Sequence, residues 1–491
     1  MAMAMAVLWA AVVVLITILA LFLRKWRNQG NDVKGLPKGC VGLPWVGETM
    51  EFMSYFSTSD PEPFVNKRVA KYGKVFKSHL FGKPTIISAD AEFNKFVMQN
   101  DQKLFNMGYP TSFTEILGTY DMLMVNGELH KKMRGYAMTF LNSKKLQDYL
   151  LNDIDSYALL VLSTWKGRVV NVQDEARAYT FRVVAKQLIS LGPGEACDSL
   201  MKEYYHLLNG IFSLPLKIPG STYAKAVQDL LATVFSNETR PEDRMTNEQI
   251  MDYFLGLLSA GHISTATVLV YAIAFLTDSP KALNQLRKSE VCFPGTCVSV
   301  RPTGLIYSFH NKLERLLMLM SGPELQEENL AIKSNLKGQR LSWNDYKNSM
   351  PFTLDVIYET LRLTNISHGL YRTPIEDIKY QGYTIPKGWT VLAYSRAVHL
   401  DGVIYEDPLA FNPLRWKTMS PTINNFVVFG GGPRQCAGYE LAKLEIAMFL
   451  HHLVTKFSWA PVEQDRKVYF PIVRMIKGLP IVVKDLKLPL S

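Results

Sequence analysis

The spacing of apolar residues along the chain predicts a mainly helical protein. Between residues 91 and 276, apolar side chains recur every three or four positions, which places them on one face of an α-helix. The segment 247–276 is long and apolar on nearly all faces, as expected for a helix that crosses the centre of a large domain. The other predicted helices are 92–100, 129–140, 145–165, 176–191, 351–363 and 439–456.

Strands are predicted only in short stretches. Residues 74–90 alternate in polarity around a Gly-Lys-Pro turn, which predicts a hairpin. Short β segments are predicted at 382–385 and 390–393, and a β-type tail follows the last helix. No internal repeat is visible. The predicted fold class is therefore mainly α with small β-sheets.

The first 23 residues contain no charged side chain. Their apolar run from residue 6 to residue 23 is broken by Thr17 alone, and at 1.5 Å per residue it can span a hydrocarbon core of about 30 Å. A cleavable signal peptide would need a charged start, a shorter apolar core and a small-residue cleavage site, which this segment lacks. Because three basic residues follow the run, residues 1–27 are predicted to be one transmembrane anchor with the rest of the chain on the cytosolic side.

The remaining chain is predicted to be a tether and one large domain. Prolines and glycines in residues 28–50 disfavour both helix and sheet, which predicts an ordered tether against the globule. No Gly/Ser/Pro-rich linker divides residues 51–491, although the length of 491 residues alone would allow about three domains.

Charge and cysteine content narrow the classes of partner. The net charge is +10, but the basic residues are spread thinly. This distribution suits an anionic membrane surface or an acidic protein partner rather than nucleic acid, which requires a concentrated basic stripe. Five scattered cysteines are too few for a disulfide framework, so a reducing, cytosol-facing environment is expected.

The candidate chemistry lies in ten residues, FGGGPRQCAG, directly before the last predicted helix. A thiolate at a helix N-terminus is stabilised by the helix dipole and by free backbone N–H groups. The glycines allow close approach of a flat cofactor, and the arginine can pair with an acidic group. A lone cysteine in a glycine-rich turn is usually structural, but here five positions of the pattern F-x-x-G-x-R-x-C-x-G occur together. They are Phe429, Gly432, Arg434, Cys436 and Gly438.

This segment resembles the haem-binding loop of the cytochrome P-450 family. The resemblance implies the cytochrome P-450 fold, haem b as cofactor, and Cys436 as the axial ligand that favours O–O cleavage. Three further residues resemble partners of the haem propionates, namely His130, Arg134 and Arg372.

The resemblance also implies a buried structural network. Glu359 and Arg362 match the family's E-x-x-R pattern, whose spacing places both side chains on one helical face. Arg415 resembles the third member of this network. Its implied role is to support the core on which the haem loop lies.

The central helix departs from the family pattern. Many members have an acid followed by a threonine here, and these groups relay protons to the oxygen being activated. In this chain Ile263 replaces the acid and Ser264 the threonine, with Thr265 following. Ser264 and Thr265 are the candidate catalytic hydroxyls, because isoleucine cannot relay a proton. This departure leaves two alternatives to a monooxygenase, a haem-thiolate isomerase or dehydratase that needs no O₂, and a catalytically impaired haem-binding remnant.

Two stretches have unusual lengths for the family. Only 127 residues separate Arg134 from Gly261, and the deficit is attributed to a truncation near 231–243. Residues 291–339 have no recognised counterpart and are interpreted as an insertion. One explanation of both is a mistaken splice assignment. Cys292, Cys297 and His310 offer too few ligands for a zinc site.

Several sequence segments, including DIKYQGYTIPKGW at 377–389, are similar to segments of plant enzymes that oxidise sterols and terpenoids. Among these enzymes, the brassinosteroid-pathway hydroxylases of the sterol side chain are especially similar. The resemblance implies an apolar sterol substrate, O₂, and electrons from an NADPH-dependent flavoprotein reductase that docks near Lys131 and Lys132. It implies a single-pass location in the endoplasmic reticulum membrane with the catalytic domain in the cytosol. Segments 105–125, 257–264 and 366–370 are expected to line the substrate cavity.

Overall fold

The structure is a computed structural model of residues 1–491. It describes residues 33–109, 118–211, 246–278 and 323–486, apart from short gaps at 44–45, 142–143, 145 and 470–472, together with Trp9, Val14, Thr17 and Leu21. The predicted anchor therefore lies almost entirely outside the described residues, as do the predicted truncation at 231–243 and the cysteines at 292 and 297.

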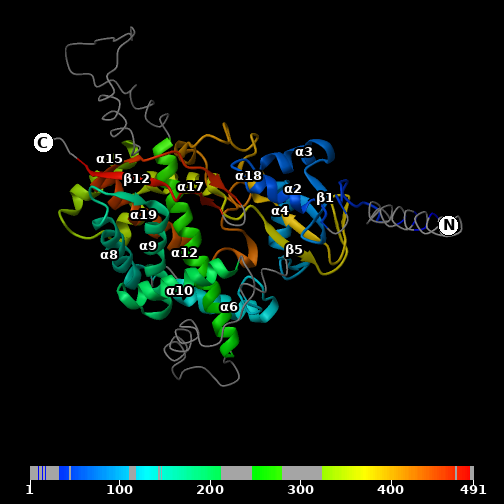
Figure 1. The fold of residues 1–491 in the computed structure, drawn as a ribbon, viewed down its shortest axis with the longest axis horizontal. Coiled ribbons are helices and arrows are strands. Elements are labelled where there is room, and N and C mark those ends of the chain that lie inside the picture. The colour runs from blue at the N-terminus through cyan, green and yellow to red at the C-terminus, as the bar shows by residue number, and fades with distance from the viewer. Residues whose placement is uncertain are drawn as a thin grey trace, which may run out of the picture.

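Most of the described chain is helical, as predicted. The helix α12 (Asn247–Asp278) runs through the middle of the helical part, and α9 packs along it (Figure 1). Val268, Leu269 and Tyr271 on α12 are buried in the largest apolar cluster, which explains why this segment is apolar on nearly all faces. The other helices that frame the site are α4 (Ala91–Gln99), α6 (Gly127–Leu141), α9 (Val172–Ile189), α17 (Pro351–Thr364) and α19 (Tyr439–Lys456).

Further helices surround this core. They are α2 (Thr49–Phe56), α3 (Glu62–Tyr72), the π-helical turn η1 (Leu146–Leu150), α8 (Leu151–Ser163), α10 (Glu195–Ile211), α15 (Pro323–Leu336), α16 (Trp343–Asn348), α18 (Ser395–His399), and the 3₁₀ turns η4 (Pro413–Lys417) and η5 (Gly432–Arg434).

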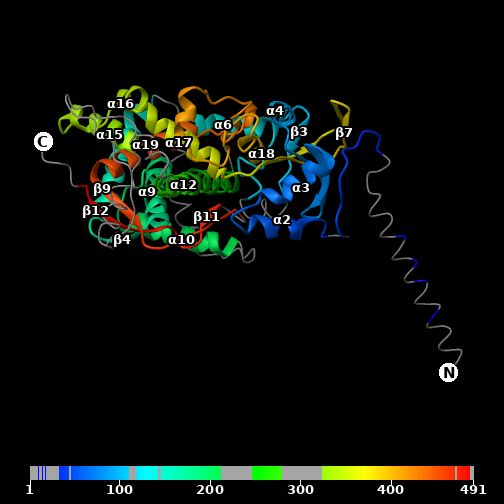
Figure 2. The same cartoon turned by 90° about the horizontal axis from the view of Figure 1, so that it is seen from above.

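The larger sheet lies at the other end of the molecule from α8 and α9, together with α2, α3 and α4 (Figure 2). Its strand order is β1-β2-β8-β5-β3, in which only β2 and β8 are parallel. The predicted hairpin 74–90 forms its first two strands, with Val75 opposite Ser88. Its strands are β1 (Val75–Leu80), β2 (Lys83–Ser88), β3 (Phe105–Met107), β5 (Leu370–Pro374) and β8 (Thr390–Ala393).

The remaining strands form small sheets. One has the order β4-β12-β9, and β6-β7 and β10-β11 are two-stranded. Their bounds are β4 (Val169–Asn171), β6 (Ile378–Tyr380), β7 (Tyr383–Ile385), β9 (Phe457–Pro461), β10 (Lys467–Val468), β11 (Arg474–Met475) and β12 (Pro480–Asp485).

The chain before α2 lies along the first strand of the large sheet. The amide of Lys77 donates to the carbonyl of Lys38 at 3.0 Å, and the amide of Glu48 donates to the carbonyl of His79 at 2.9 Å. The buried carboxylate of Glu48 also accepts hydrogen bonds from Arg68 on α3, at 2.7 and 3.3 Å. Residues 38–43 and 46–48 thus lie against the domain.

The segment predicted as an insertion is partly a regular element of the domain. Its C-terminal part forms α15, which packs against α17 and α19. The Glu328 carboxylate of α15 accepts hydrogen bonds from the amides of Phe352 and Thr353 at the start of α17. These contacts restrict a candidate insertion to the part of 291–339 that precedes residue 323.

One helix in the described part of the chain is long and apolar enough to cross a membrane. It is the stretch Asp252–Asp278 of α12, of which 61% of the most apolar window is buried inside the protein. This burial is that of the central helix of a globular domain.

Candidate functional site

The candidate cysteine lies at the start of α19, where the sequence predicted it. The amide of Cys436 donates to the carbonyl of Phe429 at 2.8 Å, which closes the loop before the helix. The Cys436 side chain is accessible although protein atoms surround it on most sides, so its thiol faces an interior space. Burial raises the pKa of this thiol, while a backbone N–H at Gly438 and the charge of Arg134 lower it.

A tight turn fixes this loop against α4. Gly432 has a φ of +68°, and a Cβ atom there would lie 2.3 Å from the carbonyl oxygen of Met98. Both the conformation and the close approach exclude a larger residue. This contact explains the glycine that the motif requires at position 432.

Two buried arginines share one carboxylate beside the loop. Arg434 contacts one oxygen of Asp101 at 2.7 Å, and Arg372 on β5 contacts the other at 2.8 Å. Asp101, which follows α4, is 1% exposed and Arg372 is 2% exposed. Since one negative charge faces two positive charges, the cluster has a surplus positive charge in a buried setting. Such a site favours a further anion.

His130 and Arg134 on α6 lie on the same side of the loop. Burial, and the charge of Arg434, lower the pKa of His130 to about 4, so its ring is neutral at cellular pH. Gln102 Nε2 lies 2.7 Å from His130 Nδ1. With the Gln102 amide as donor, the ring proton is on Nε2, which can donate to an anion. Arg134 donates to the carbonyl of Gln435 at 2.6 Å, directly before the cysteine.

The two candidate hydroxyls of α12 face different surroundings. Thr265 is 3% exposed, and its hydroxyl donates to the carbonyl of Gly261 at 3.0 Å. Gly261 lies on the helix face that packs against Val184 of α9, one turn from Thr265. Ser264 is only half-buried, and its hydroxyl donates to the carbonyl of Ala260 at 2.5 Å. Of the two, Ser264 is therefore on the accessible face.

The structure brings the three members of the predicted network together. Glu359 and Arg362 have no exposed side-chain surface, and their two hydrogen bonds measure 2.8 and 2.9 Å. Arg415 donates to the same carboxylate at 3.0 Å. Trp416 Nε1 and the amide of Asn412 complete its shell at 3.0 and 2.9 Å. The network joins α17 to the segment that precedes the cysteine loop.

Sequence reasoning assigned residues 105–125 to the substrate cavity but did not predict that the end of this segment connects the cysteine loop to α12. Residues 118–126 precede α6, and Arg434 donates to the carbonyls of Met122 and Val125 at 3.2 and 2.6 Å. On its other side the buried Asp121 packs against Gly256 of α12, where a Cβ atom would lie 1.8 Å from Oδ2. Burial, with a contribution from Asp252, raises the pKa of Asp121 to about 7. No spacing in the sequence links these residues.

A sequence model of the family described as "Cytochrome P450" matches residues 37–217 and 315–480. The chain belongs to the cytochrome P450 family. It is therefore an oxidoreductase of the haem-dependent monooxygenase type, and its cofactor is haem. The family match resumes before α15, in agreement with the packing of that helix.

Curated relatives of this P450 are plant enzymes of steroid metabolism. The chain is 40% identical to "3beta,22alpha-dihydroxysteroid 3-dehydrogenase" of Arabidopsis thaliana, over 97% of this chain and 98% of that protein. It is 37% identical to "Steroid (22S)-hydroxylase" of Brachypodium distachyon, over 93% and 90% of the two chains. Among solved structures, "Retinoic acid bound cyanobacterial CYP120A1" superposes with a TM-score of 0.72 at 25% identity, covering 93% of this chain and all of that one. The predicted family and plant branch are confirmed.

The residues at the site fit a haem group. A haem carries two propionates, and the surplus charge of Arg372 and Arg434 with the neutral donor His130 suits such anions. The accessible thiol of Cys436 is placed where it could supply the sulfur ligand that this family uses. No group of three or more His, Cys, Asp and Glu residues that could hold a separate metal ion occurs in the part of the chain that the structure describes.

Proposed function

We propose that this P450 is a membrane-anchored haem-thiolate monooxygenase that hydroxylates a steroid in brassinosteroid biosynthesis. Haem bound at Cys436 would supply oxygen activation, as in other members of the family. The other site residues would bind the haem and hold it in place. Arg372, Arg434, His130 and Arg134 would hold the propionate side, and the Glu359 network would support the loop.

One observation carries the proposal most directly. The thiol of Cys436 is open to an interior space at the N-terminus of α19, and beside it two buried guanidinium groups share the single carboxylate of Asp101. A buried surplus charge is costly unless an anion joins it. A sulfur ligand with an anion site beside its loop is what haem requires.

A half-buried hydroxyl on α12 supports the proposal that the protein catalyses a reaction and does not only bind haem. The Ser264 hydroxyl donates to the carbonyl of Ala260, and its oxygen can accept a hydrogen bond from water; rotation of the hydroxyl away from that carbonyl would let it donate its proton onward. Ile263 contributes no proton. We therefore assign proton delivery to Ser264, because Thr265 makes the same kind of hydrogen bond but is buried.

The names of the relatives support a steroid substrate. They include "Steroid (22S)-hydroxylase", "Cholesterol 22-hydroxylase CYP90B27" and "3-epi-6-deoxocathasterone 23-monooxygenase CYP90D1". We therefore propose hydroxylation of the steroid side chain. The rigid rings of such a substrate call for an apolar cavity, for which the residues around Tyr109 and Ile366 are available.

Membrane attachment and electron supply complete the proposal. The apolar run at residues 6–23 and the basic residues behind it support a single-pass anchor in the endoplasmic reticulum with the domain in the cytosol. Lys131 on α6 is largely exposed, on the helix that also carries Arg134. It is available for the acidic surface of an NADPH-dependent flavoprotein reductase.

The decisive experiment measures products. Full-length holoprotein in microsomes, with reductase and NADPH, is given labelled cholesterol, and products are separated by mass. A product that has gained one oxygen atom, formed only with NADPH and O₂, is expected. Unchanged substrate with a haem-loaded, reducible enzyme would contradict a steroid hydroxylase.

A second candidate reaction is suggested by the relative named as a 3-dehydrogenase, at 40% identity. In that case a hydroxysteroid would lose two hydrogen atoms and become a ketone, with O₂ as the oxidant and NADPH still consumed. The same assay on a dihydroxysteroid separates the two candidates by the mass of the product.

A further inference from the structure

His368 is a polar residue in an otherwise aromatic part of the interior. It lies between α17 and β5, in the segment expected to line the cavity. The residue is only half-buried although protein surrounds it closely, which indicates an interior space beside it. Burial, and to a smaller extent the charge of Arg396, lower the pKa of His368 to about 4. The ring is therefore neutral at cellular pH.

Aromatic rings hold His368 in place. Its ring centroid lies 4.9 Å from that of Phe56 and 5.8 Å from that of Phe52, both on α2. The rings of Tyr371 and Tyr394 lie 6.1 and 6.5 Å away. A leucine or phenylalanine would fill this surrounding equally well. The use of histidine here leaves a polar group to be satisfied.

One ring nitrogen has a protein partner. Nε2 lies 3.3 Å from the phenol oxygen of Tyr371. Among the described residues this phenol has no other hydrogen-bond acceptor, so it donates to Nε2 and places the ring proton on Nδ1. Nδ1 has no hydrogen-bond partner in the part of the chain that the structure describes. A donor therefore remains for a group that enters the interior space.

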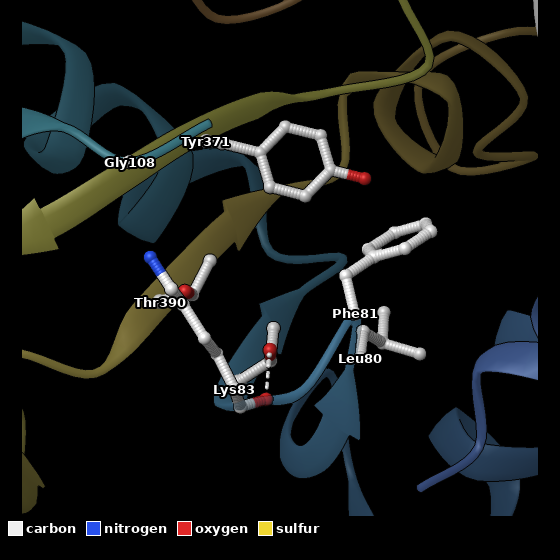
Figure 3. A pocket seen from close by; sticks show the side chains of 7 residues that line it. Leu80, Phe81, Lys83, Gly108, Tyr371 and Thr390 are labelled. Carbon is white, nitrogen blue, oxygen red and sulfur yellow. Dashed lines mark hydrogen bonds between the residues drawn. The ribbon is translucent and has the colours of Figure 1, made fainter. Parts of the chain in front are cut away.

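Tyr371 connects His368 to the haem side. Its ring lies 5.4 Å from that of Tyr109, whose pKa responds to the charges of Arg372 and Arg434. On its other side Tyr371 forms one wall of a hollow at the sheet, which Phe81 and Lys83 of the β1–β2 turn also line (Figure 3). Tyr371 thus borders this hollow and, through its contact with Tyr109, connects His368 to the surroundings of Arg372 and Arg434.

We propose that His368 Nδ1–H donates a hydrogen bond to a hydroxyl or keto oxygen of the steroid, at the end remote from the carbon that is oxidised. This inference rests on the proposed function, since it assumes a steroid in the cavity above Cys436. His368 is then a positioning residue: it fixes which end of an elongated, two-ended substrate faces the cofactor.

The test compares ligands that differ by one hydroxyl. Cholesterol, cholest-5-ene (which lacks the 3-hydroxyl) and 22-hydroxycholesterol are titrated into full-length holoprotein, and the shift in haem absorbance gives each dissociation constant. Wild-type protein, His368→Leu, His368→Gln and Tyr371→Phe are compared. In wild type, one of the two hydroxyls should improve affinity about five- to tenfold, the contribution of one hydrogen bond.

His368→Leu should abolish that preference and leave the affinity for the ligand without the hydroxyl nearly unchanged. His368→Gln, which keeps a donor, should retain part of it. Tyr371→Phe removes the phenol that keeps the ring proton on Nδ1, so the proton can lie on either ring nitrogen. This variant should reduce the preference by less than His368→Leu does. The hydroxyl whose advantage disappears identifies the end of the steroid that lies away from the haem.

Two other results have distinct meanings. If His368→Leu weakens all three ligands equally, the residue only packs, and the proposal is overturned while the steroid function stands. If wild-type holoprotein gives no absorbance shift with any of the three, the steroid substrate is refuted, and the role of His368 with it. Haem content measured for every variant shows that each comparison is between folded proteins.

Discussion

Removal of Arg362 should prevent this protein from reaching a haem-loaded state. The guanidinium donates to both oxygens of Glu359, and to the carbonyls of His399, Pro408 and Ala410 at 2.7, 2.7 and 3.2 Å. Arg362→Ala removes all of these bonds at once, in a place where neither charged partner has exposed side-chain surface.

The magnitude follows from what remains around Glu359. Arg415, Trp416 and the Asn412 amide still donate to it, so its charge is not bare. Breaking one partner of a buried ion pair typically costs about 3–5 kcal/mol. A domain stable by roughly 5–15 kcal/mol would lose about a fifth of its stability or more. Trp416→Phe removes a single bond to the carboxylate and should cost about 1.5–3 kcal/mol.

The assay is the yield of soluble protein and its haem content, with urea unfolding for those variants that fold. Arg362→Ala should give little holoprotein, Trp416→Phe an intermediate amount, and Lys131→Ala, which breaks the exposed pair with Glu128, the wild-type amount. Arg362→Lys keeps the charge but loses the forked geometry and should fall below Trp416→Phe. Normal yield and haem content for Arg362→Ala would refute the reasoning.

Three other predictions concern the site and the anchor. Cys436→Ser should abolish the thiolate-type Soret band of the reduced, CO-bound protein, because a hydroxyl cannot donate electron density as a thiolate does; a retained band would rule out Cys436 as the ligand. Ile263→Glu combined with Ser264→Thr should raise the amount of product formed per NADPH consumed, since a positioned acid typically contributes about 10²–10⁴-fold in rate. The control is Ile263→Gln combined with Ser264→Thr. Equal product per NADPH in the two variants would mean that the acid is dispensable. Deletion of residues 1–27 should release most of the protein from membranes without loss of haem, as measured by membrane flotation and the CO spectrum. If the shortened protein stays fully membrane-bound, attachment does not depend on this segment.

Local signals were predicted well from the sequence. The ten-residue cysteine loop and the helix after it are contiguous, so turn chemistry and periodicity suffice, and the predicted helix 439–456 coincides with α19. The hairpin at 74–90 was found in the same way. The predicted helix 145–165 instead begins with the π-helical turn η1, which widens the backbone locally and leaves no mark in the apolar spacing.

Contacts between distant segments could not be predicted. Asp101 is 333 residues from Arg434, and only the fold joins them. The helices α2 and α3 were missed because each is short, and their ends depend on tertiary partners such as the Glu48–Arg68 pair. The resemblance to a family supplied Arg372 and the network of Glu359, which spacing alone would have assigned to an ordinary surface.

The four hydrogen bonds of Arg434 have a consequence for local opening of the protein. One side chain joins its own loop to Asp101 and to the segment 122–126, both of which lie more than 300 residues earlier in the chain. These parts should therefore exchange their amide hydrogens as one cooperative unit rather than independently. In the apoprotein the surplus positive charge loosens this unit, so exchange at Leu123 and Met124 should be fast. Loading with haem should slow it severalfold, and these two amides would then report cofactor occupancy from a loop that does not itself carry the ligand.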